Sequence, residues 1–337
     1  MNIHGWIENI VLKQPFFITG RSFCEAQVLR VRVSERGHEG IGEAAGVYYK
    51  GETAALMLAQ LEAFNASREP RLDRFSLHRS LPAGGLRNAL DCALWQLESS
   101  QRQVPLCQLA NLRSTRPLVT TMTVGVDTPE NMAINAAAYA GAKAVKLKLD
   151  GGPLDRERIR QVRRASPQVR LLLDANQGWT LDHLENLLPT LLACRIELIE
   201  QPLPLGADQD LLGYSCPIPL AADESFQQFK DLENVAGKYQ YVNIKLDKCG
   251  GLTEALQIAA MAPRHGLGVM VGSMLGTSLA MAPAFIAGQY ATIVDLDAPL
   301  FLTRDVDHAA VYQQGSIDFP SMSTLPVLSA GAARATA

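Results

Sequence analysis

The stretch AGAKAVKLKLD, residues 140–150, places two lysines two positions apart inside an apolar run. Successive side chains of a β-strand point to opposite faces, so Lys146 and Lys148 would share one face, with Val145 and Leu147 on the other. A shared lysine face is either exposed to solvent or part of a site, since lysine is almost never fully buried without a partner. The runs around this stretch decide between the two interpretations.

Short apolar runs alternate with helical stretches from about Arg116 onward. This alternation predicts a parallel sheet, and eight such units are typical of a (β/α)8-type barrel. The eight runs are LVTTMTVGV (118–126), AVKLKLD (144–150), RLLLDAN (170–176), IELIEQP (196–202), IPLAADES (218–225), YVNIKLD (241–247), LGVMVGS (267–273) and TIVDLD (292–297). The lysine stretch is the second of them, so we expect a barrel strand there.

The first third of the chain has a different pattern. AQVLRVRVSERGHEGIGEAA (26–45) predicts a β-hairpin with Gly37 near its turn, whereas GETAALMLAQLEAF (51–64) and LRNALDCALWQLESS (86–100) predict helices. This mixture indicates a small α+β unit ahead of the barrel. Asp91 lies on the second of these helices, and we interpret it as structural rather than catalytic.

The composition is that of an ordinary soluble globular protein. Of 337 residues, 47% are hydrophobic and 19% charged, and the formal net charge of −3 offers no basic surface for nucleic acid or an anionic membrane. A small molecule is therefore the expected partner, and neither a secretion signal nor a membrane span is expected. The six cysteines form no CxxC pair, which argues against zinc and disulfides and favours reduced thiols in the cytoplasm. The sequence does not indicate an oligomeric state.

Polar or ionisable residues stand at the C-terminal tips of nearly all the runs. In (β/α)8 barrels the active site is built at this end of the strands. The residues are Lys148, Asp174, Glu200, Asp223, Lys245, Ser273, Asp295 and Asp297. We therefore expect an active site that gathers them at one end of the barrel.

Asp174, Glu200 and Asp223 end three consecutive runs, the third to the fifth. Three carboxylates at close range cannot all stay ionised without a cation between them. Oxygen ligands without histidine or cysteine favour Mg²⁺, with Mn²⁺ as a substitute. The alternative is three separate helix N-caps, because an aspartate after a strand often caps the next helix.

Lys148 and Lys245 end the second and sixth runs, which are four strands apart in a closed eight-stranded barrel. They would face each other across the mouth, with the carboxylates on the arc between them. One base on each face of a carbon, with a divalent ion to stabilise the enediolate, suits removal of an α-proton from one side and its return on the other. This arrangement predicts racemisation or epimerisation. β-Elimination and exposed, non-catalytic lysines are the alternatives.

Lys146 shares the face of Lys148 but lies one layer deeper in the predicted barrel. Two roles are equally compatible with that position. Lys146 would either orient the substrate carboxylate and lower the pKa of Lys148, as a lysine base requires, or form a buried ion pair with a metal-binding carboxylate.

With these motifs in place, the sequence resembles the enolase superfamily, muconate-lactonising subgroup, over nearly its whole length. The resemblance rests on KLK, DANQGW, IEQPL, ADES and NIKLDKCGG in the order and spacing of that family. It implies an α/β fold with a modified (β/α)7β barrel over 113–299, covered by an α+β capping domain over 1–112 that the segment 300–337 completes. It also implies Mg²⁺ at the three carboxylates and acid/base catalysis by Lys148 and Lys245.

Asp295 and Asp297, in VDLDAP, lie on one face of the eighth run, and two carboxylates there suit a cation. In dipeptide epimerases of this superfamily, a similar D-x-D motif binds the α-ammonium group of the substrate. Muconate cycloisomerases and o-succinylbenzoate synthases act on substrates without an ammonium group, so the pair argues against these two alternatives. A strand-end turn or cap is the remaining alternative for the pair.

LPAGGLRNALDCALW, NIKLDKCGGLTEAL and GSMLGTS resemble the bacterial L-Ala-D/L-Glu epimerases, which act on a dipeptide from murein turnover. This resemblance implies interconversion of L-Ala-L-Glu and L-Ala-D-Glu, with other dipeptides as alternative substrates. Arg21 stands where those enzymes commonly carry the arginine for the glutamate side chain, and Lys50 would assist or replace it. Ser273 is assigned to the substrate-carboxylate region in preference to a phosphate site. An inactive metal-binding or scaffolding relative is the alternative from a different class.

Overall fold

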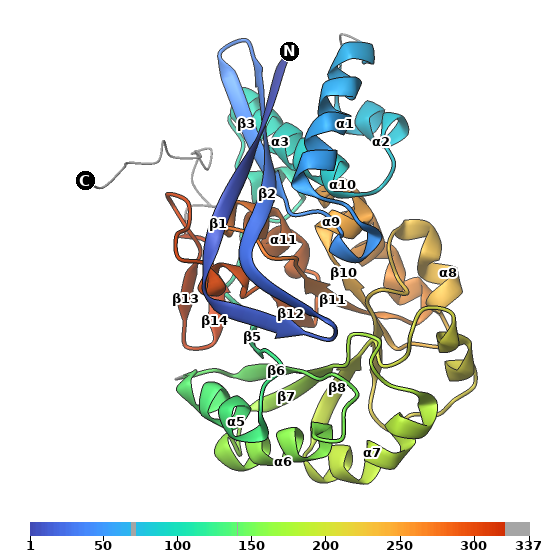
Figure 1. Ribbon diagram of the computed structural model, residues 1–337. Coiled ribbons are helices and arrows are strands. Elements are labelled where there is room, and N and C mark those ends of the chain that lie inside the picture. The colour runs from blue at the N-terminus through green and yellow to red at the C-terminus, as the bar shows by residue number, and fades with distance from the viewer. Residues whose placement is uncertain (69–71, 140, 321–337) are drawn as a thin grey trace.

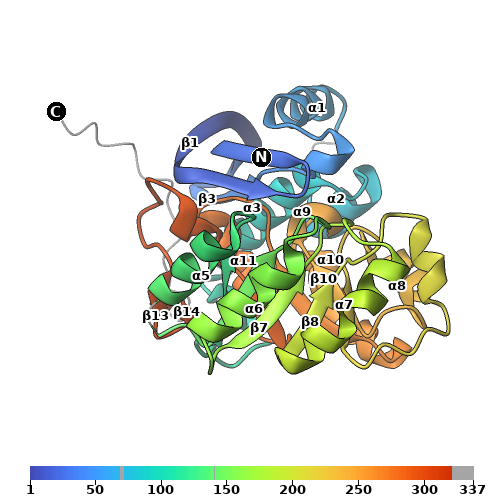
Figure 2. The same ribbon diagram turned by 60° about the horizontal axis from the view of Figure 1, so that its bottom comes forward.

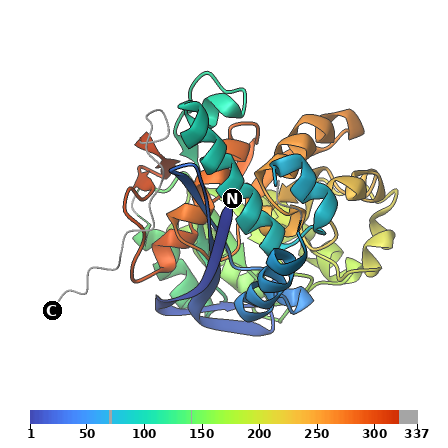
Figure 3. The ribbon, with the colours of Figure 1, turned by 90° about the horizontal axis from the view of Figure 1, so that it is seen from above.

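The computed structural model describes residues 1–68, 72–139 and 141–320. An N-terminal α+β domain lies against one end of an eight-stranded parallel sheet that helices surround (Figure 1). Seen from the side of the N-terminal domain, its strands and helices lie over the barrel (Figure 3). The sheet has the order β12-β11-β10-β9-β8-β7-β6-β5, so consecutive strands are neighbours throughout. The predicted fold class, a modified barrel with an N-terminal capping domain, is confirmed.

The N-terminal domain is built on a three-stranded antiparallel sheet. Its elements are β1 (Asn2–Ile18), β2 (Arg21–Glu35), β3 (His38–Ala44), η1 (Tyr48–Lys50), α1 (Ala54–Ser67), α2 (Arg74–Ser80) and α3 (Gly85–Arg102). The predicted hairpin is β2–β3, whose turn residues Arg36 and Gly37 have φ of +51° and +80°, as a two-residue type I′ turn requires. The sequence pattern does not predict β1, because polar residues interrupt its apolar alternation.

Two glycines allow α3 to pack closely against β3. A Cβ atom added at Gly40 would lie 2.1 Å from the carbonyl oxygen of Ala93, and one at Gly42 would lie 2.0 Å from that of Ala89. Both distances are far below van der Waals contact, so only glycine fits at this separation. The close packing buries most of α3 between the antiparallel sheet and the barrel.

The barrel consists of short parallel strands with helices on the outside. The strands are β5 (Thr121–Val124), β6 (Ala144–Lys148), β7 (Arg170–Asp174), β8 (Ile196–Glu200), β9 (Leu220–Ala222), β10 (Tyr241–Ile244), β11 (Gly268–Gly272) and β12 (Ile293–Asp295). The helices from the link to the end of the barrel are α4 (Leu106–Leu109), α5 (Pro129–Ala138), α6 (Asp155–Ala165), α7 (Leu181–Ala193), η2 (Ala207–Leu211), η3 (Phe229–Asp231), α8 (Leu232–Val235), α9 (Leu246–Cys249), α10 (Leu252–Met261), η4 (Ala262–His265), α11 (Ser278–Gly288) and η5 (Ala298–Phe301). Figure 2 shows α5, α6 and α7 along the outer side of the barrel.

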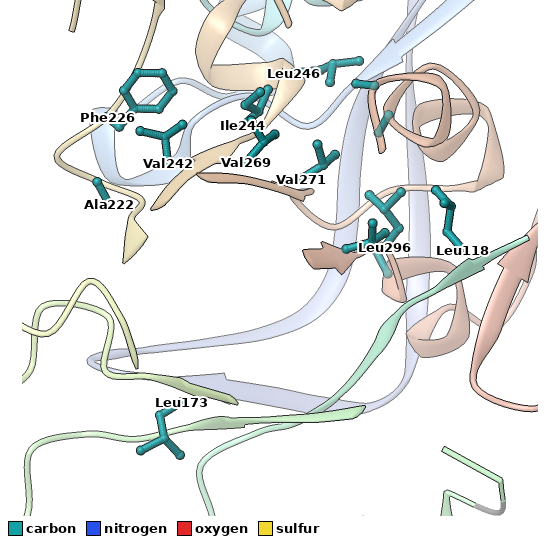
Figure 4. Close-up of a cluster of buried hydrophobic side chains, with 14 of the residues drawn as sticks. Leu118, Leu173, Ala222, Phe226, Val242, Ile244, Leu246, Val269, Val271 and Leu296 are labelled. Atoms are coloured by element: carbon teal, nitrogen blue, oxygen red, sulfur yellow. The ribbon is translucent and has the colours of Figure 1, made fainter. Parts of the chain in front are cut away.

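The two faces of the barrel strands bury different side chains. Outward-facing residues such as Leu173, Val242 and Val271 belong to the main hydrophobic core beneath the helices, part of which Figure 4 shows. Inward-facing residues form a smaller cluster inside the barrel, which consists of Ala144, Leu172, Leu198, Ala221 and Met270. Because side chains alternate, Lys146 and Lys148 follow Ala144 on the inner face. The lysine face is therefore interior, not solvent.

Polar side chains close the barrel between β12 and β5, the two ends of the sheet order. Asp297 Oδ2 accepts a hydrogen bond from the Thr123 N–H at 2.6 Å. Asp295 accepts a hydrogen bond from the hydroxyl of Thr121. The first and last barrel strands are thus joined by the two aspartates that the sequence assigns to substrate binding.

The C-terminal segment contacts both domains. Leu302 forms an isolated antiparallel bridge with Leu12 of β1. Farther along, β13 (Val311–Gln313) pairs with β14 (Ser316–Asp318), and β14 pairs with β4 (Leu118–Val119), which directly precedes β5. Of the segment expected to complete the capping domain, residues 321–337 lie outside the described residues.

Polar side chains of α3 dock the N-terminal domain onto the barrel. Asp91 accepts hydrogen bonds from the backbone N–H and the hydroxyl of Thr253, at 2.9 and 2.6 Å. Trp95 donates its indole N–H to the same hydroxyl at 2.9 Å, and Arg87 forms an ion pair with Glu254. Burial raises the pKa of Asp91 to about 6. Asp91 therefore has the structural role that we expected, at the contact between the domains.

None of the helices in the described parts of the chain combines the length and apolar character needed to cross a membrane. Four cysteines, Cys92, Cys107, Cys194 and Cys249, are buried.

Replacing Asp91 with alanine is expected to lower the free energy of unfolding by about 1–3 kcal/mol, because the N–H and hydroxyl of Thr253 would lose a buried acceptor. Gln101→Ala, at an exposed position of the same helix, is the matched control and should change that free energy by less than about 0.5 kcal/mol. Urea unfolding followed by circular dichroism measures both variants. Equal stabilities would contradict the docking role.

Candidate active site at the barrel mouth

The ends of the barrel strands bring most of the predicted site residues to one cavity of about 410 Å³ between the barrel and the N-terminal domain. The predicted residues that line it are Arg21, Lys146, Lys148, Lys245, Ser273, Asp295 and Asp297. Asp174, Glu200 and Asp223 are 0–1% exposed and contact the lysines that line the cavity. Lys50 does not belong to this group.

Lys146 lies at the centre of the carboxylates. Its Nζ atom is 2.6 Å from Glu200 Oε2, 2.7 Å from Asp295 Oδ2 and 3.1 Å from Asp174 Oδ2. Its side chain is 1% exposed. These contacts make Lys146 the shared cation of a buried ion-pair cluster. Because it also lines the cavity, its role toward a substrate carboxylate stays a prediction.

Each of the two predicted bases is paired with a carboxylate. Lys148 Nζ lies 2.5 Å from Asp174 Oδ2, and Lys245 Nζ lies 2.7 Å from Asp223 Oδ2. Three strands separate β6, which ends at Lys148, from β10, which Lys245 follows. The two lysines thus reach the carboxylate cluster from different sides of the barrel.

The surrounding charges act differently on Asp174 and Glu200. Burial alone would raise the pKa of Asp174, but Lys148 and Lys146 outweigh it and bring that pKa down to about 2. For Glu200, burial and repulsion by Asp174 raise the pKa to about 7. Glu200 is therefore the carboxylate whose negative charge is compensated least.

Asp223 is held by two lysines, since Lys248 Nζ lies 2.5 Å from Asp223 Oδ1 in addition to the contact with Lys245. Burial would lower the pKa of Lys245, but attraction by Asp223 and Glu200 outweighs it and raises that pKa well above its ordinary value. The charges nearest to Lys245 are carboxylates, whereas the expected lowering of a lysine pKa depends on neighbouring cations, the metal ion among them. That expectation therefore stays a prediction.

The carboxylate cluster fits a divalent cation by its donor chemistry. Glu200 Oε2 accepts no hydrogen bond from any described residue, although Lys146 Nζ lies 2.6 Å away. Three buried carboxylates offer oxygen donors alone, which is the ligand type of Mg²⁺. Within residues 1–68, 72–139 and 141–320, no three Asp, Glu, His or Cys side chains form a ready-made metal-binding group. The carboxylates instead pair with lysines, which a cation would have to replace.

Asp295 and Asp297 face the cavity from the end of β12. Lys146 lowers the pKa of Asp295 against the effect of burial. For Asp297, burial and repulsion by Asp295 raise the pKa to about 7. A cation that binds beside Asp297 would relieve this repulsion, so the position suits an ammonium group.

Arg21 reaches the cavity from the turn between β1 and β2, which extends towards β6 and β7 (Figure 1). Its guanidinium carbon lies 5.0 Å from the ring centroid of Tyr48 and 5.8 Å from that of Phe23, which are cation–π distances. Thr19 attaches the turn to the barrel by donating its hydroxyl to the carbonyl oxygen of Leu149 at 2.8 Å. The capping domain thus presents a cation at the edge of the cavity.

Lys50 lines a separate pocket of about 300 Å³, together with Glu52, Arg87 and Lys248. Tyr48 and Lys50 belong to the 3-10 helix η1, which has three residues per turn, so side chains two positions apart point in different directions. Tyr48 lines the cavity at the barrel mouth, and Lys50 lines the separate pocket. The expected placement of Lys50 beside Arg21 is therefore corrected.

Two residues of the cluster do not figure in the sequence prediction. Asn243 donates its amide N–H to Glu200 Oε1 at 2.7 Å, and Lys248 donates to the carbonyl oxygen of Asp223 at 2.6 Å. Asn243 lies two positions before Lys245, so strand alternation already indicates that both face inward. Lys248 lies on α9, and only the tertiary structure shows that this helix returns its side chain to Asp223.

Both halves of the chain match family models. Residues 6–110 match the N-terminal domain of the mandelate racemase / muconate lactonizing enzymes. Residues 131–323 match the enolase C-terminal domain-like family. The two matches leave out the link that contains β4 and β5.

Relatives of known activity align along most of the chain. The L-Ala-D/L-Glu epimerase of Escherichia coli strain K12 is 39% identical over 308 residues, which cover 91% of this chain and 96% of the relative. An N-acetyl-D-glutamate racemase of Pseudoalteromonas sp. is 37% identical over 289 residues, which cover 85% and 91%.

Solved structures share the fold. An enolase family member from Agrobacterium tumefaciens with homology to dipeptide epimerases, with bound sodium and L-Ala-L-Glu, has a TM-score of 0.89 at 37% identity and covers 94% of this chain and 96% of its own. A dipeptide epimerase from Methylococcus capsulatus, complexed with Mg and the dipeptide L-Arg-D-Lys, has a TM-score of 0.86 at 30% identity and covers 94% and 96%.

Replacing Lys146 with methionine is expected to lower the free energy of unfolding in EDTA by about 3–5 kcal/mol, because buried carboxylates would lose their shared cation. Added Mg²⁺ should restore more stability in this variant than in the parent protein, since the metal would supply the missing positive charge. Urea unfolding with EDTA and with Mg²⁺ measures both effects. Lys143→Met, at an exposed lysine just before β6, is the control. A loss that Mg²⁺ does not reduce would argue against a metal at these carboxylates.

Proposed function

Because the chain belongs to the mandelate racemase / muconate lactonizing enzyme family of the enolase superfamily, we propose that it is a dipeptide epimerase acting at the α-carbon of the C-terminal residue. One arrangement carries the proposal. Lys148 and Lys245 reach one carboxylate cluster from different strands, and Asp297 faces the same cavity. The first substrate that we assign is L-Ala-L-Glu, interconverted with L-Ala-D-Glu.

Lys148 and Lys245 are the proton-transfer groups of this proposal. An α-proton next to a carboxylate is weakly acidic, so its removal needs a base within hydrogen-bonding reach. The neutral lysine on one face takes the proton, and the ammonium group of the other lysine returns a proton on the opposite face. The two lysines have then exchanged protonation states, which is the starting state for the reverse reaction.

Asp174, Glu200 and Asp223 would hold the metal, for which we propose Mg²⁺ with Mn²⁺ as a substitute. When bound, the cation would act as a Lewis acid toward the substrate carboxylate and stabilise negative charge at the reacting carbon. The Mg in the Methylococcus capsulatus epimerase supports this choice. The chain itself would bury the three carboxylates. Once the metal balances the charge of these carboxylates, Lys148 and Lys245 would no longer be held in ion pairs with Asp174 and Asp223.

The two ends of the dipeptide meet opposite charges in the cavity. Asp297, beside Asp295, would bind the α-ammonium group, and Arg21 would bind the glutamate side chain. Substrates of muconate cycloisomerases and o-succinylbenzoate synthases lack an ammonium group, which disfavours these reactions. L-Ala-D-Glu is a murein dipeptide, so we propose a role in murein peptide turnover. N-acetylglutamate racemisation is a second candidate, supported by the Pseudoalteromonas relative.

Incubation with Mg²⁺ and L-Ala-L-Glu in D₂O should remove the glutamate α-proton signal and produce the second diastereomer, because the returned proton comes from a lysine that exchanges with solvent. Proton NMR follows both changes. N-acetyl-L-glutamate under the same conditions tests the second candidate. Failure to exchange an α-proton on any dipeptide, with Mg²⁺ shown to bind, would contradict the epimerase.

The same NMR measurement on single-lysine variants tests the division of labour. Lys148→Ala and Lys245→Ala should each slow epimerisation by at least about a hundredfold, yet each should still exchange the α-proton of one diastereomer, because one base remains. Lys143→Ala serves as the exposed-lysine control. A variant that exchanges both diastereomers would rule out one base on each face.

Asp297→Asn is expected to lower kcat/KM for L-Ala-L-Glu by about 10- to 100-fold, because an amide offers the ammonium group no opposite charge. Turnover of N-acetyl-L-glutamate, whose acylated nitrogen is uncharged, should not fall with it. Both substrates are assayed side by side by NMR, so each is the control for the other. An equal loss for the two substrates would contradict recognition of the ammonium group by Asp297.

A further inference from the structure

β9 ends one residue before Asp223, so the sheet does not hold the backbone of this residue in place. β9 consists of three residues, and its ladders to β8 and β10 end at Ala221 and Ala222. Asp223 lies beyond these pairs, yet it is 1% exposed and its carboxylate belongs to the buried cluster. A buried backbone N–H needs an acceptor, so something other than the sheet has to supply one here.

The side chain of Gln201 supplies that acceptor. Gln201 Oε1 accepts hydrogen bonds from the N–H groups of Asp223 and Ser225, both at 3.0 Å. Its Nε2 atom donates to Leu203 O at 2.9 Å, Ser225 Oγ at 2.8 Å and Tyr239 Oη at 3.1 Å. One amide that is 0% exposed thus joins the end of β8 to the end of β9 and to the segment before β10.

The backbone of Gln201 is held in an uncommon conformation. Its φ is +36°, in the left-handed region that residues other than glycine seldom adopt. Such a conformation persists only where the surrounding contacts over-determine it, and it is frequent at functional sites. This conformation turns the chain directly after Glu200. The side chain of Gln201 then accepts the hydrogen bond from the Asp223 N–H that a further residue pair of the sheet would otherwise accept.

We propose that Gln201 is a positioning residue of the metal site. Its amide fixes the backbone that follows Glu200 against the backbone of Asp223, and the spacing of these two carboxylates sets the affinity for Mg²⁺. The inference rests on the metal site of the proposed function. Gln201 does not line the cavity, so it acts through the two carboxylates and not on the substrate. Partners of this kind hold metal ligands in place in many proteins.

Two substitutions separate the hydrogen bonds of Gln201 from its size. Gln201→Met keeps the length of the side chain and removes every hydrogen bond. Gln201→Glu keeps an acceptor for the Asp223 N–H, because burial favours the neutral carboxylic acid. Isothermal titration of the metal-free protein with MgCl₂ gives the Kd of each. We expect Gln201→Met to weaken Mg²⁺ binding by about 10- to 100-fold and Gln201→Glu to stay within about threefold of the parent.

Asp91→Ala is the control for stability, because it loses buried hydrogen bonds between α3 and Thr253 without touching the carboxylate cluster. It should unfold more easily than the parent and bind Mg²⁺ with the same Kd. Tyr239→Phe removes one partner of the amide and replaces Gln201→Met if that variant does not fold. For Tyr239→Phe we expect a Kd about two- to fivefold higher than that of the parent.

The outcomes distinguish the positioning role of Gln201 from the existence of the metal site. A parent-like Kd for Gln201→Met, or for Tyr239→Phe in its place, would overturn the positioning role and leave the metal site intact. If Asp91→Ala lost as much Mg²⁺ affinity as Gln201→Met, general destabilisation would explain both losses. That result would also overturn the positioning role of Gln201. A parent protein that binds no Mg²⁺ would overturn the metal site of the proposed function, and the role of Gln201 with it.

Discussion

The repulsion among buried carboxylates is the constraint on which the rest of the structure depends. Asp174, Glu200 and Asp223 are almost inaccessible to water, and charges in such a place persist only when they are paired. Lys146 contacts two of them and Asp295 as well, so it connects the three carboxylates to the aspartate pair. Because Lys146 on β6 contacts Glu200 on β8 and Asp295 on β12, charge joins strands that no backbone ladder joins directly.

The same ion pairs show what the proposed role of lysines as bases requires in a site crowded with carboxylates. Without another cation, attraction by Asp223 and Glu200 raises the pKa of Lys245 well above its ordinary value, and the lysine keeps its proton. A divalent cation at the carboxylates would compete for them, and the lysines would then face other cations instead of opposite charges. In the proposed mechanism, binding of the metal and activation of the bases are therefore one electrostatic event. A lysine that stabilises the cluster without the metal would be a proton-transfer group with it.

Much of the site could be predicted because two regularities determine it. Parallel strands bring their carboxyl ends to one end of the barrel, and alternation places Lys146, Lys148 and Asp174 on the inner face. The regularities end where the strands end. The direction of Lys50 on a 3-10 helix and the return of Lys248 from α9 depend on tertiary packing that no residue spacing encodes. The raised pKa of Lys245 is also inaccessible from the sequence, since it depends on distances between side chains.

The position of Asp295 and Asp297 ties the proposed recognition of the substrate to closure of the barrel. Both aspartates accept hydrogen bonds from β5, across the seam where β5 and β12 meet through side chains. A change that adapts the cavity to an uncharged group must therefore remove a charge and keep an acceptor, which asparagine does and alanine does not. Arg21 is under no such constraint, because the turn that carries it reaches the barrel from the capping domain and is attached there through Thr19. Under the proposed function, preference for the second residue of the dipeptide can thus change by single substitutions in the turn, whereas the proposed recognition of an ammonium group is tied to the contacts that close the barrel.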